Sequence, residues 1–238
     1  ALGTYFLDLN SLNITDPTGL EEFVNLRGLN ISNNNLSVIN VSTMNEIDYL
    51  DVSSNNLNTL NINNNLLLKV LYVANNNLTG INIGPLNLRE FGCDNNSIVS
   101  LNLTNSTDLE RLYATNNALN GLDITSNINL QYAFVNENPN IGQLDLTNQT
   151  QLIEFGASNI GDSTFDLSSN PNLEILQLPN NLITGINLSN NLLLRELDLN
   201  NNDIFGSFDF SNHNALEIVL FEGNNLNQLN LKNGNTNA

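Results

Sequence analysis

Residues 109–129 read LERLYATNNALNGLDITSNIN and contain one complete unit of a repeat that runs along the chain. Numbered from Leu109 as position 1, the unit has apolar residues at positions 1, 4, 6, 11, 14 and 16 and Asn at positions 9 and 19. Other units begin at Leu26, Ile47, Leu68, Leu88, Leu130, Leu152, Leu173, Leu194 and Leu216. A fixed period near 21 residues predicts a solenoid in which each period forms one coil.

The Asn at position 9 is the most regular mark of the repeat. The first six are 21, 21, 20, 21 and 21 residues apart. An inward amide offers both an acceptor oxygen and donor hydrogens, so it can satisfy the backbone groups that a corner leaves unpaired. We therefore predict a structural ladder formed by Asn34, Asn55, Asn76, Asn96, Asn117, Asn138, Asn181, Asn202 and Asn224. Ile160 interrupts this series beside Gly156 and Gly161, and we expect a local irregularity there.

The apolar residues at positions 4 and 6 alternate with outward residues, which is the period of a short strand. Positions 14 and 16 repeat the pattern on the other half of each coil. Each half has about ten residues, too few for a helix of useful length. The pattern predicts a mainly β solenoid of about ten coils with few or no helices. Either two parallel sheets or one sheet facing extended segments would fit it.

Composition excludes several classes of partner. The 238-residue chain has 24 acidic and 6 basic residues, a formal net charge of −18, so it repels nucleic acid and anionic membrane surfaces. No apolar run reaches the roughly 20 residues that span a bilayer, so membrane insertion is not expected. Cys93 is the single cysteine and His213 the single histidine, which excludes an intrachain disulfide and a His-based metal cluster. We predict no catalytic residues and no enzyme.

The repeat resembles the bacterial leucine-rich repeats, and in particular their nested 21-residue class, sometimes called IRREKO. The resemblance covers residues 26–231. It implies a right-handed arc, a secreted or cell-surface bacterial protein, and binding rather than catalysis. It supplies no functional residues to transfer to this chain.

Three segments are expected from the extent of the repeat. Residues 1–25 do not fit the unit and are predicted to form an N-terminal cap, with a strand near Phe6 and a short helix after Asp16. Residues 26–231 form the array. Residues 232–238 are a polar tail, and an uncapped last coil indicates a fragment of a longer protein.

The outward positions 3, 5 and 7 of the first strand form the predicted binding face. Four of the chain's five tyrosines fall on it, and clustered exposed aromatics favour recognition of a protein or a glycan. The alternative is that Tyr is there for its strand propensity. Gly92 is expected to leave a shallow gap between Tyr72 and Tyr113. The candidate binding residues are Tyr49, Val70, Tyr72, Glu90, Arg111, Tyr113, Tyr132 and Phe134.

Position 15 of the second half forms an acidic stripe in three consecutive coils, at Asp123, Asp145 and Asp166. We favour a solvated stripe, in which case no cofactor is needed. The alternative is a Ca²⁺ site, to which nearby Ser and Thr hydroxyls would contribute oxygens. A second apolar patch, at Ile175, Ile218 and Leu220, is a candidate contact between subunits of an oligomer.

The leading functional hypothesis is a non-catalytic extracellular recognition or adhesion module that uses the aromatic-bearing strand face. The alternative is a structural spacer within a larger bacterial surface protein. Ice binding is disfavoured because positions 13–17 lack a regular Thr array. A polysaccharide-active enzyme is disfavoured because the carboxylates form a stripe without a predicted cleft.

Overall fold

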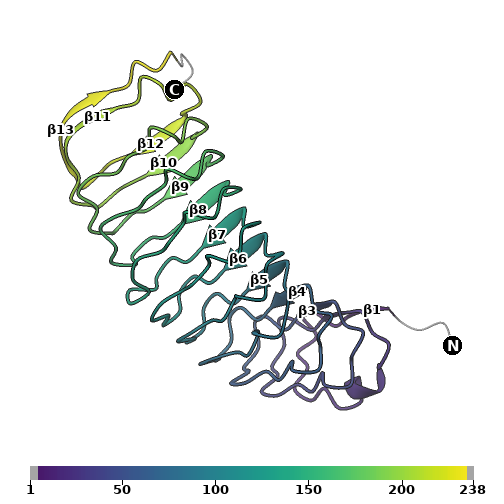
Figure 1. Cartoon of the computed structure of the whole chain (residues 1–238). Coiled ribbons are helices and arrows are strands. Elements are labelled where there is room, and N and C mark those ends of the chain that lie inside the picture. Colours follow the sequence, from purple (N-terminus) through teal and green to yellow (C-terminus); the bar gives the residue numbers. More distant parts are fainter. Residues whose placement is uncertain (1–4, 235–238) are drawn as a thin grey trace.

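The computed structural model describes residues 5–234, and the chain winds into an elongated stack of coils with the strands along one flank (Figure 1). One parallel sheet of 11 strands, ordered β1 to β10 and then β12, runs the length of the stack. Its strands are β1 Phe6–Asp8, β2 Gly28–Asn30, β3 Tyr49–Asp51, β4 Val70–Tyr72, β5 Glu90–Gly92, β6 Arg111–Tyr113, β7 Tyr132–Phe134, β8 Glu154–Gly156, β9 Ile175–Gln177, β10 Glu196–Asp198 and β12 Ile218–Leu220. The predicted leucine-rich-repeat solenoid is confirmed.

The other regular elements are few. A single turn of 3-10 helix, η1, covers Leu20–Glu22, and residues 5–234 contain no α-helix. Strands β11 (Phe205–Asp209) and β13 (Asn225–Asn230) pair in parallel and form a separate two-stranded sheet in the last coils. No helix in the described part of the chain is long and apolar enough to cross a membrane.

The core lies between the sheet and the second half of each coil. In the coil that begins at Leu109, the inward residues Leu112, Ala114 and Leu119 are fully buried, and Ile124 is nearly so. Cys93 occupies the same inward row, and burial raises the pKa of its thiol well above the ordinary value. It therefore packs as a small apolar side chain.

The predicted Asn ladder is confirmed at all nine positions. Asn117 is typical: its Oδ1 accepts a hydrogen bond from the N–H of Ile98 in the preceding coil at 3.0 Å. Its Nδ2 donates to the carbonyl of Cys93 in that coil at 3.0 Å and to that of Ala114 in its own coil at 3.3 Å. Each amide thus ties two coils together. The residue before each ladder position has a left-handed φ, which is 53° to 58° at the first eight positions and 73° at Gly223. Asn, as at Asn116, tolerates this conformation better than most residues.

Ile160 interrupts the ladder because the preceding coil turns differently. Pro139 has no N–H, and the N–H of Ile141 donates to the carbonyl of Asn138 within its own coil at 3.0 Å. The N–H that would meet a ladder amide is therefore already satisfied, and the buried Ile160 takes the place of the amide. Strand β8 itself pairs in register with both neighbours, so the predicted irregularity lies in the corners and not in the strand.

A second buried polar ladder lies at position 19, on the corner that leads back to the sheet. Asn127, for example, donates to the carbonyls of Leu103 and Ser106 at 3.1 and 2.7 Å. Its residue types vary, so it is less visible in the sequence than the first ladder. Its buried members are Asn65, Ser106, Asn127, Gln149, Asn170, Asn191, His213 and Asn233.

The choice between one sheet and two is resolved in favour of one long sheet facing extended segments, except at β11 and β13. Local hydrogen bonds contribute to this, although Asp209 and Asn230 make the same bond within β11 and β13. At nine of the ten position-15 residues, the side-chain Oδ1 accepts the backbone N–H two residues later, as Asn102 does from Thr104 at 3.2 Å. Such Asx turns satisfy backbone donors locally and compete with a sheet ladder. We call this side of the solenoid the turn flank.

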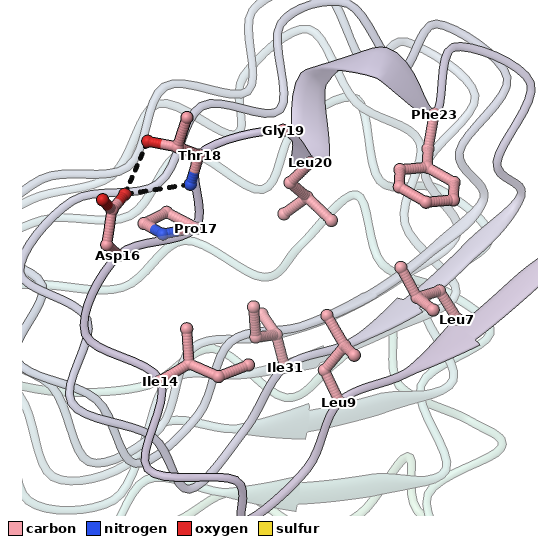
Figure 2. A pocket seen from close by; sticks show the side chains of 10 residues that line it. All are labelled: Leu7, Leu9, Ile14, Asp16, Pro17, Thr18, Gly19, Leu20, Phe23 and Ile31. Atoms are coloured by element: carbon pink, nitrogen blue, oxygen red, sulfur yellow. Dashed lines mark hydrogen bonds between the residues drawn. The ribbon is translucent and has the colours of Figure 1, made fainter.

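The segment predicted as an N-terminal cap provides the first rung of the long sheet. Strand β1 pairs in parallel with β2, placing Leu7 beside Leu29. Figure 2 shows the apolar pocket at this end of the core, with Leu20 and Phe23 on one side and Leu7 and Leu9 on the other. Its volume is about 430 Å³. Residues 1–4 of the predicted cap and residues 235–238 of the predicted tail lie outside the described residues.

Candidate binding face

The outward residues of β1 to β10 and β12 form what we call the strand flank. Because the strands pair in register, Tyr72, Gly92, Tyr113 and Phe134 follow one another in a single row. The adjacent row contains the other candidate binding residues, Tyr49, Val70, Glu90, Arg111 and Tyr132, in that order. The structure thus brings all eight predicted residues together on one flank, and all eight are partly exposed.

The aromatic side chains contact one another in groups. The rings of Phe6 and Tyr49 are 5.8 Å apart, and those of Tyr49 and Tyr72 meet edge to face at 6.2 Å. Tyr113 and Phe134 stack at 5.7 Å with an interplanar angle of 6°. Together with Tyr132 these residues form what we call the aromatic strip, which consists of Phe6, Tyr49, Tyr72, Tyr113, Tyr132 and Phe134.

Glycine in the strand flank supports the rings and does not leave a gap. A Cβ added to Gly92 would lie 2.7 Å from Cδ1 of Tyr72, and one added to Gly156 would lie 2.9 Å from Cδ1 of Phe134. Each ring therefore lies over the glycine of the next coil. The predicted shallow gap at Gly92 is wrong, because the ring of Tyr72 fills it.

Arg111 is held at the centre of the strip by three contacts. Its Nη1 lies 3.9 Å from Glu90 and 3.8 Å from Glu110, and its guanidinium lies 4.9 Å from the centre of the Tyr132 ring. The hydroxyl of Tyr72 donates a short hydrogen bond to the same Glu90. The central residues are thus positioned before any partner arrives, which lowers the entropic cost of binding.

The tyrosine hydroxyls lie in a negative electrostatic environment. Partial burial raises the pKa values of Tyr49, Tyr72 and Tyr113 above 10.0, and nearby carboxylates raise them further. The effect is largest at Tyr72, whose hydroxyl donates to Glu90. Burial also raises the pKa of Asp94, although that carboxylate accepts the N–H of Thr115 at 2.7 Å.

A shallow bowl opens beside the stacked pair of rings. It has a volume of about 410 Å³ and is lined by Asp94, Asn95, Tyr113, Thr115, Phe134 and Asn136. Asn136 is held in place, because its Oδ1 accepts the N–H of Ser158 at 2.7 Å. The bowl therefore combines an aromatic wall with fixed polar groups.

Position 5 of the strand flank shows a local departure from the repeat. In four coils this position is Asp or Asn and accepts the backbone N–H two residues later, at Asp8, Asn30, Asp51 and Asp198. In the central coils the residue is aromatic or glycine, at Tyr72, Gly92, Tyr113, Phe134 and Gly156. The aromatic strip has therefore replaced a residue type that stabilises the coil.

The acidic stripe on the turn flank has a structural explanation. Asp123 accepts hydrogen bonds from the N–H and hydroxyl of Thr125 at 2.9 and 2.6 Å, and Asp145 makes the same pair of bonds to Thr147. These bonds lower the pKa values of Asp123, Asp145 and, with Ser168, Asp166. Within residues 5–234, no group of three or more His, Cys, Asp or Glu residues could hold a metal ion. Binding of Ca²⁺ to this stripe stays a prediction.

The predicted oligomer patch is divided by a charged residue. Ile218 and Leu220 on β12 are 44% and 41% exposed. Glu196 stands between Ile175 and Ile218 in the strand register. Only the β12 pair forms a continuous apolar surface, and self-association through it stays a prediction.

Sequence reasoning missed Phe6, which extends the aromatic strip by two coils beyond Tyr49, across Gly28. Phe6 is 54% exposed and pairs with Gly28 in register. The signal was present, because Leu7 and Leu9 repeat the inward alternation of positions 4 and 6. Treating the first 25 residues as a separate cap concealed it.

The single histidine and the single cysteine are both structural. His213 is buried, with Nε2 at 3.1 Å from the carbonyl of Leu188 and its ring edge-on to Phe210. Cys93 is buried in the core. Neither side chain lies on the strand flank.

Comparison with known proteins finds solved bacterial leucine-rich repeat structures that are similar to this chain. No family model and no curated protein matches the sequence. The functional domain of InlJ from Listeria monocytogenes, described as including a cysteine ladder, is 30% identical with a TM-score of 0.84, and the match covers 89% of this chain and 47% of that one. This chain therefore spans about half the length of that domain.

Two further solved structures share the fold. The leucine-rich effector protein YopM from Yersinia pestis is 24% identical with a TM-score of 0.76, over 95% of this chain and 68% of that one. The internalin InlF from Listeria monocytogenes is 22% identical with a TM-score of 0.74, over 93% of this chain and 74% of that one. The chain has the leucine-rich-repeat fold that these bacterial proteins share, as the repeat predicted.

Proposed function

We propose that this leucine-rich repeat chain is a non-catalytic recognition module that binds a protein through its aromatic strip. The observation that carries the proposal is the change of residue type at position 5 of the strand flank in the central coils. Elsewhere on the strand flank, Asp51 and Asp198 use this position to satisfy a backbone N–H. In the central coils Tyr72, Tyr113 and Phe134 replace that bond with partly exposed rings, which a purely structural repeat does not need.

The chemistry of the strip suits a protein surface. Tyr and Arg are enriched at protein interfaces and dominate their binding energy, because they combine rigid apolar area with a polar end. Arg111, Tyr72 and Tyr132 provide this combination in adjacent coils, already fixed by Glu90. The similarity to solved internalin structures supports a bacterial, secreted or cell-surface setting, in which adhesion would be the biological role.

A glycan is the second candidate ligand, and the bowl beside Tyr113 and Phe134 is the observation that favours it. Aromatic rings with neighbouring amide and carboxylate groups suit the apolar and hydroxyl faces of a sugar. Asp94 and Asn136 supply the polar groups. The strip extends well beyond this bowl to Phe6, however, which favours a longer protein surface.

The test is a screen of cell-surface proteins and glycans with the parent chain and the Tyr72→Ala/Tyr113→Ala double variant. The matched control is Phe205→Ala, because Phe205 is 67% exposed on β11, away from the strip. We expect the double variant to keep its circular dichroism spectrum and to lose at least about tenfold in affinity. The control should bind like the parent.

Two results would overturn the proposal. Unchanged affinity of the double variant for the partner found would remove the aromatic strip from binding. A chain that binds nothing in the screen, yet separates folded neighbouring domains in its full-length protein, would instead support the structural spacer.

A further inference from the structure

The charges around the aromatic strip are unbalanced. Five carboxylates act on the hydroxyls of its tyrosines: those of Asp8, Asp51, Glu90, Asp94 and Glu154. The guanidinium of Arg111 is the one cation that acts on the same hydroxyls. It is already paired with Glu90 and Glu110. The strip therefore presents rings within an excess of negative charge.

We propose that the aromatic strip binds a basic segment of its partner protein, one in which Lys or Arg side chains alternate with apolar residues. The inference rests on the proposed function and names the chemistry of the partner. Carboxylates would pair with the partner's cations, and the rings would receive its apolar groups and the stems of its basic side chains.

The strip already shows how such a segment would be held. Arg111 of the chain itself lies over the Tyr132 ring at 4.9 Å while its guanidinium faces Glu90. A ring face and a carboxylate thus share one cation at this point. The rings of Tyr72 and Phe134 lie over Gly92 and Gly156 and are partly exposed, so part of each ring is open to a cation of the partner. Cations over such faces add a cation–π attraction to the ion pairs.

The chain's other cations do not neutralise the strip. Four of them, Arg27, Lys69, Arg89 and Arg195, lie at the entrance to their strands, and the last three pair with acidic residues there. The guanidinium of Arg27 lies over the Tyr5 ring, 5.8 Å from its centre. The Arg89–Glu110 and Arg195–Glu217 distances are 3.0 and 3.1 Å, and Lys69 lies 3.9 Å from Asp108. Lys69, Arg89 and Arg195 are thus held within the chain's own ion pairs, and Arg27 is a single further cation at the β1 end. A net negative charge therefore remains on the strip for a partner.

Overall charge argues against a second copy of this chain as the occupant. With 24 acidic and 6 basic residues, two copies repel each other and neither offers a basic segment rich enough to satisfy the strip. Anionic nucleic acids are repelled for the same reason. A separate basic protein is the occupant that the charges favour.

The experiment measures binding of synthetic Lys-rich, neutral and Glu-rich peptides of equal length and equal aliphatic content to the parent chain by fluorescence polarisation. We expect only the Lys-rich peptide to bind well. Its affinity should fall roughly tenfold when the salt is raised from about 50 mM to about 300 mM, because ions screen the exposed charges. Equal binding of the neutral and Lys-rich peptides, or no binding of either, would overturn the inference.

Matched variants separate local from overall charge. The strip variant is Asp8→Asn/Asp51→Asn/Glu154→Gln, and the control is Asp123→Asn/Asp145→Asn/Asp166→Asn on the turn flank. Both remove three carboxylates, and an amide oxygen can still accept the backbone N–H that each Asp caps. The strip variant should bind the Lys-rich peptide about tenfold more weakly and the control within about twofold of the parent. Equal losses in both variants would contradict a local basic site.

The Tyr72→Ala/Tyr113→Ala variant distinguishes this inference from the proposed function. A protein partner whose binding needs both tyrosines but does not change with salt or with the strip charges would keep the function and overturn the basic segment. A sugar whose binding needs the tyrosines, without any peptide binding, would favour the second candidate ligand and would also overturn the basic segment. A Lys-rich peptide that needs both the tyrosines and the carboxylates would support both proposals.

Discussion

The turn flank and the strand flank of this solenoid use equivalent outward positions in opposite ways. On the turn flank, position 15 is Asn or Asp in all ten coils of the array, and nine of these side chains accept a backbone N–H of their own coil. On the strand flank, position 5 keeps that role only outside the central coils. Between Tyr72 and Gly156 it carries rings or no side chain at all.

The two flanks differ because their backbone groups are satisfied in different ways. Backbone groups on the strand flank are satisfied by the sheet between coils, as in the pairing of β4, β5 and β6. Its outward side chains are therefore free to vary. The turn flank has no such ladder over most of its length and depends on its side chains, so its uniform acidic and amide residues have a role in folding.

The largest expected loss of stability comes from the first ladder, which serves both flanks. Replacing Asn117 with Leu leaves the buried N–H of Ile98 without its amide partner. It also removes one of the two ladder amides that donate to each of the Cys93 and Ala114 carbonyls. We expect the free energy of unfolding in urea to fall by about 3 kcal/mol or more. As a control, Ile160→Asn should not stabilise the chain, because Ile141 already donates within its own coil. A loss below about 1 kcal/mol for Asn117→Leu would show that the ladder is dispensable.

A smaller effect should separate the two flanks within one coil. Asn187 at position 15 accepts the N–H of Ser189 at 3.1 Å, so Asn187→Ala should cost about 1 kcal/mol. Gln177 at position 5 of the same coil makes no such bond, and Gln177→Ala should stay within about 0.5 kcal/mol of the parent. Paired urea denaturation curves measure both. The comparison of the flanks fails if the order of the two losses is reversed.

The stability that each flank contributes should be lost at opposite ends of the pH scale. The pKa values of Tyr49, Tyr72 and Tyr113 are higher in the folded chain than the value of 10.0 in the unfolded chain. Their contribution to the free energy of unfolding is therefore complete below pH 10.0 and is lost as the pH rises from 10.0 through the folded pKa values. The lowered pKa values of Asp123 and Asp145 act in the other direction. Their stabilisation is present above 3.8 and is lost as the pH falls through the folded values.

Absorbance titration of the phenols tests the alkaline limb. The Glu90→Gln variant removes the charge that Tyr72 faces, so one phenol should ionise at lower pH than in the parent. An unchanged titration would mean that Glu90 does not act on the strip.

The smallest expected effect concerns Ca²⁺. Because Asp123 and Asp145 already accept bonds from their own loops, millimolar Ca²⁺ should change Tm by less than about 1 °C. A larger rise in the parent that Asp123→Asn/Asp145→Asn/Asp166→Asn abolishes would establish a calcium site and turn the acidic stripe into a functional surface.

The sequence predicted the features that recur in every coil. The inward residues and the Asn117 ladder follow from spacing alone, because a fixed period leaves one way to stack the coils. The sequence pattern also correctly placed Tyr72 and Tyr113 on one flank. It did not predict the second ladder, since Asn127, Gln149 and His213 share a place but not a residue type.

Side-chain contacts between coils were harder to predict than the flank on which each residue lies. The ring of Tyr72 lying over Gly92, and its bond to Glu90, depend on side-chain conformation across two strands. The Asx role of Asp123 depends on a local turn that competes with a sheet. Neither follows from the period.

The most direct test of the account restores the default residue of the repeat at two positions of the strip. In the Tyr72→Asn/Phe134→Asn variant, each amide could cap the N–H two residues later, offsetting the lost ring contacts of about 1 kcal/mol each. The account predicts a free energy of unfolding within about 2 kcal/mol of the parent, together with at least about tenfold weaker binding of the partner. A loss of about 4 kcal/mol or more, or full binding by a folded variant, would show that the rings serve the fold and contradict the account.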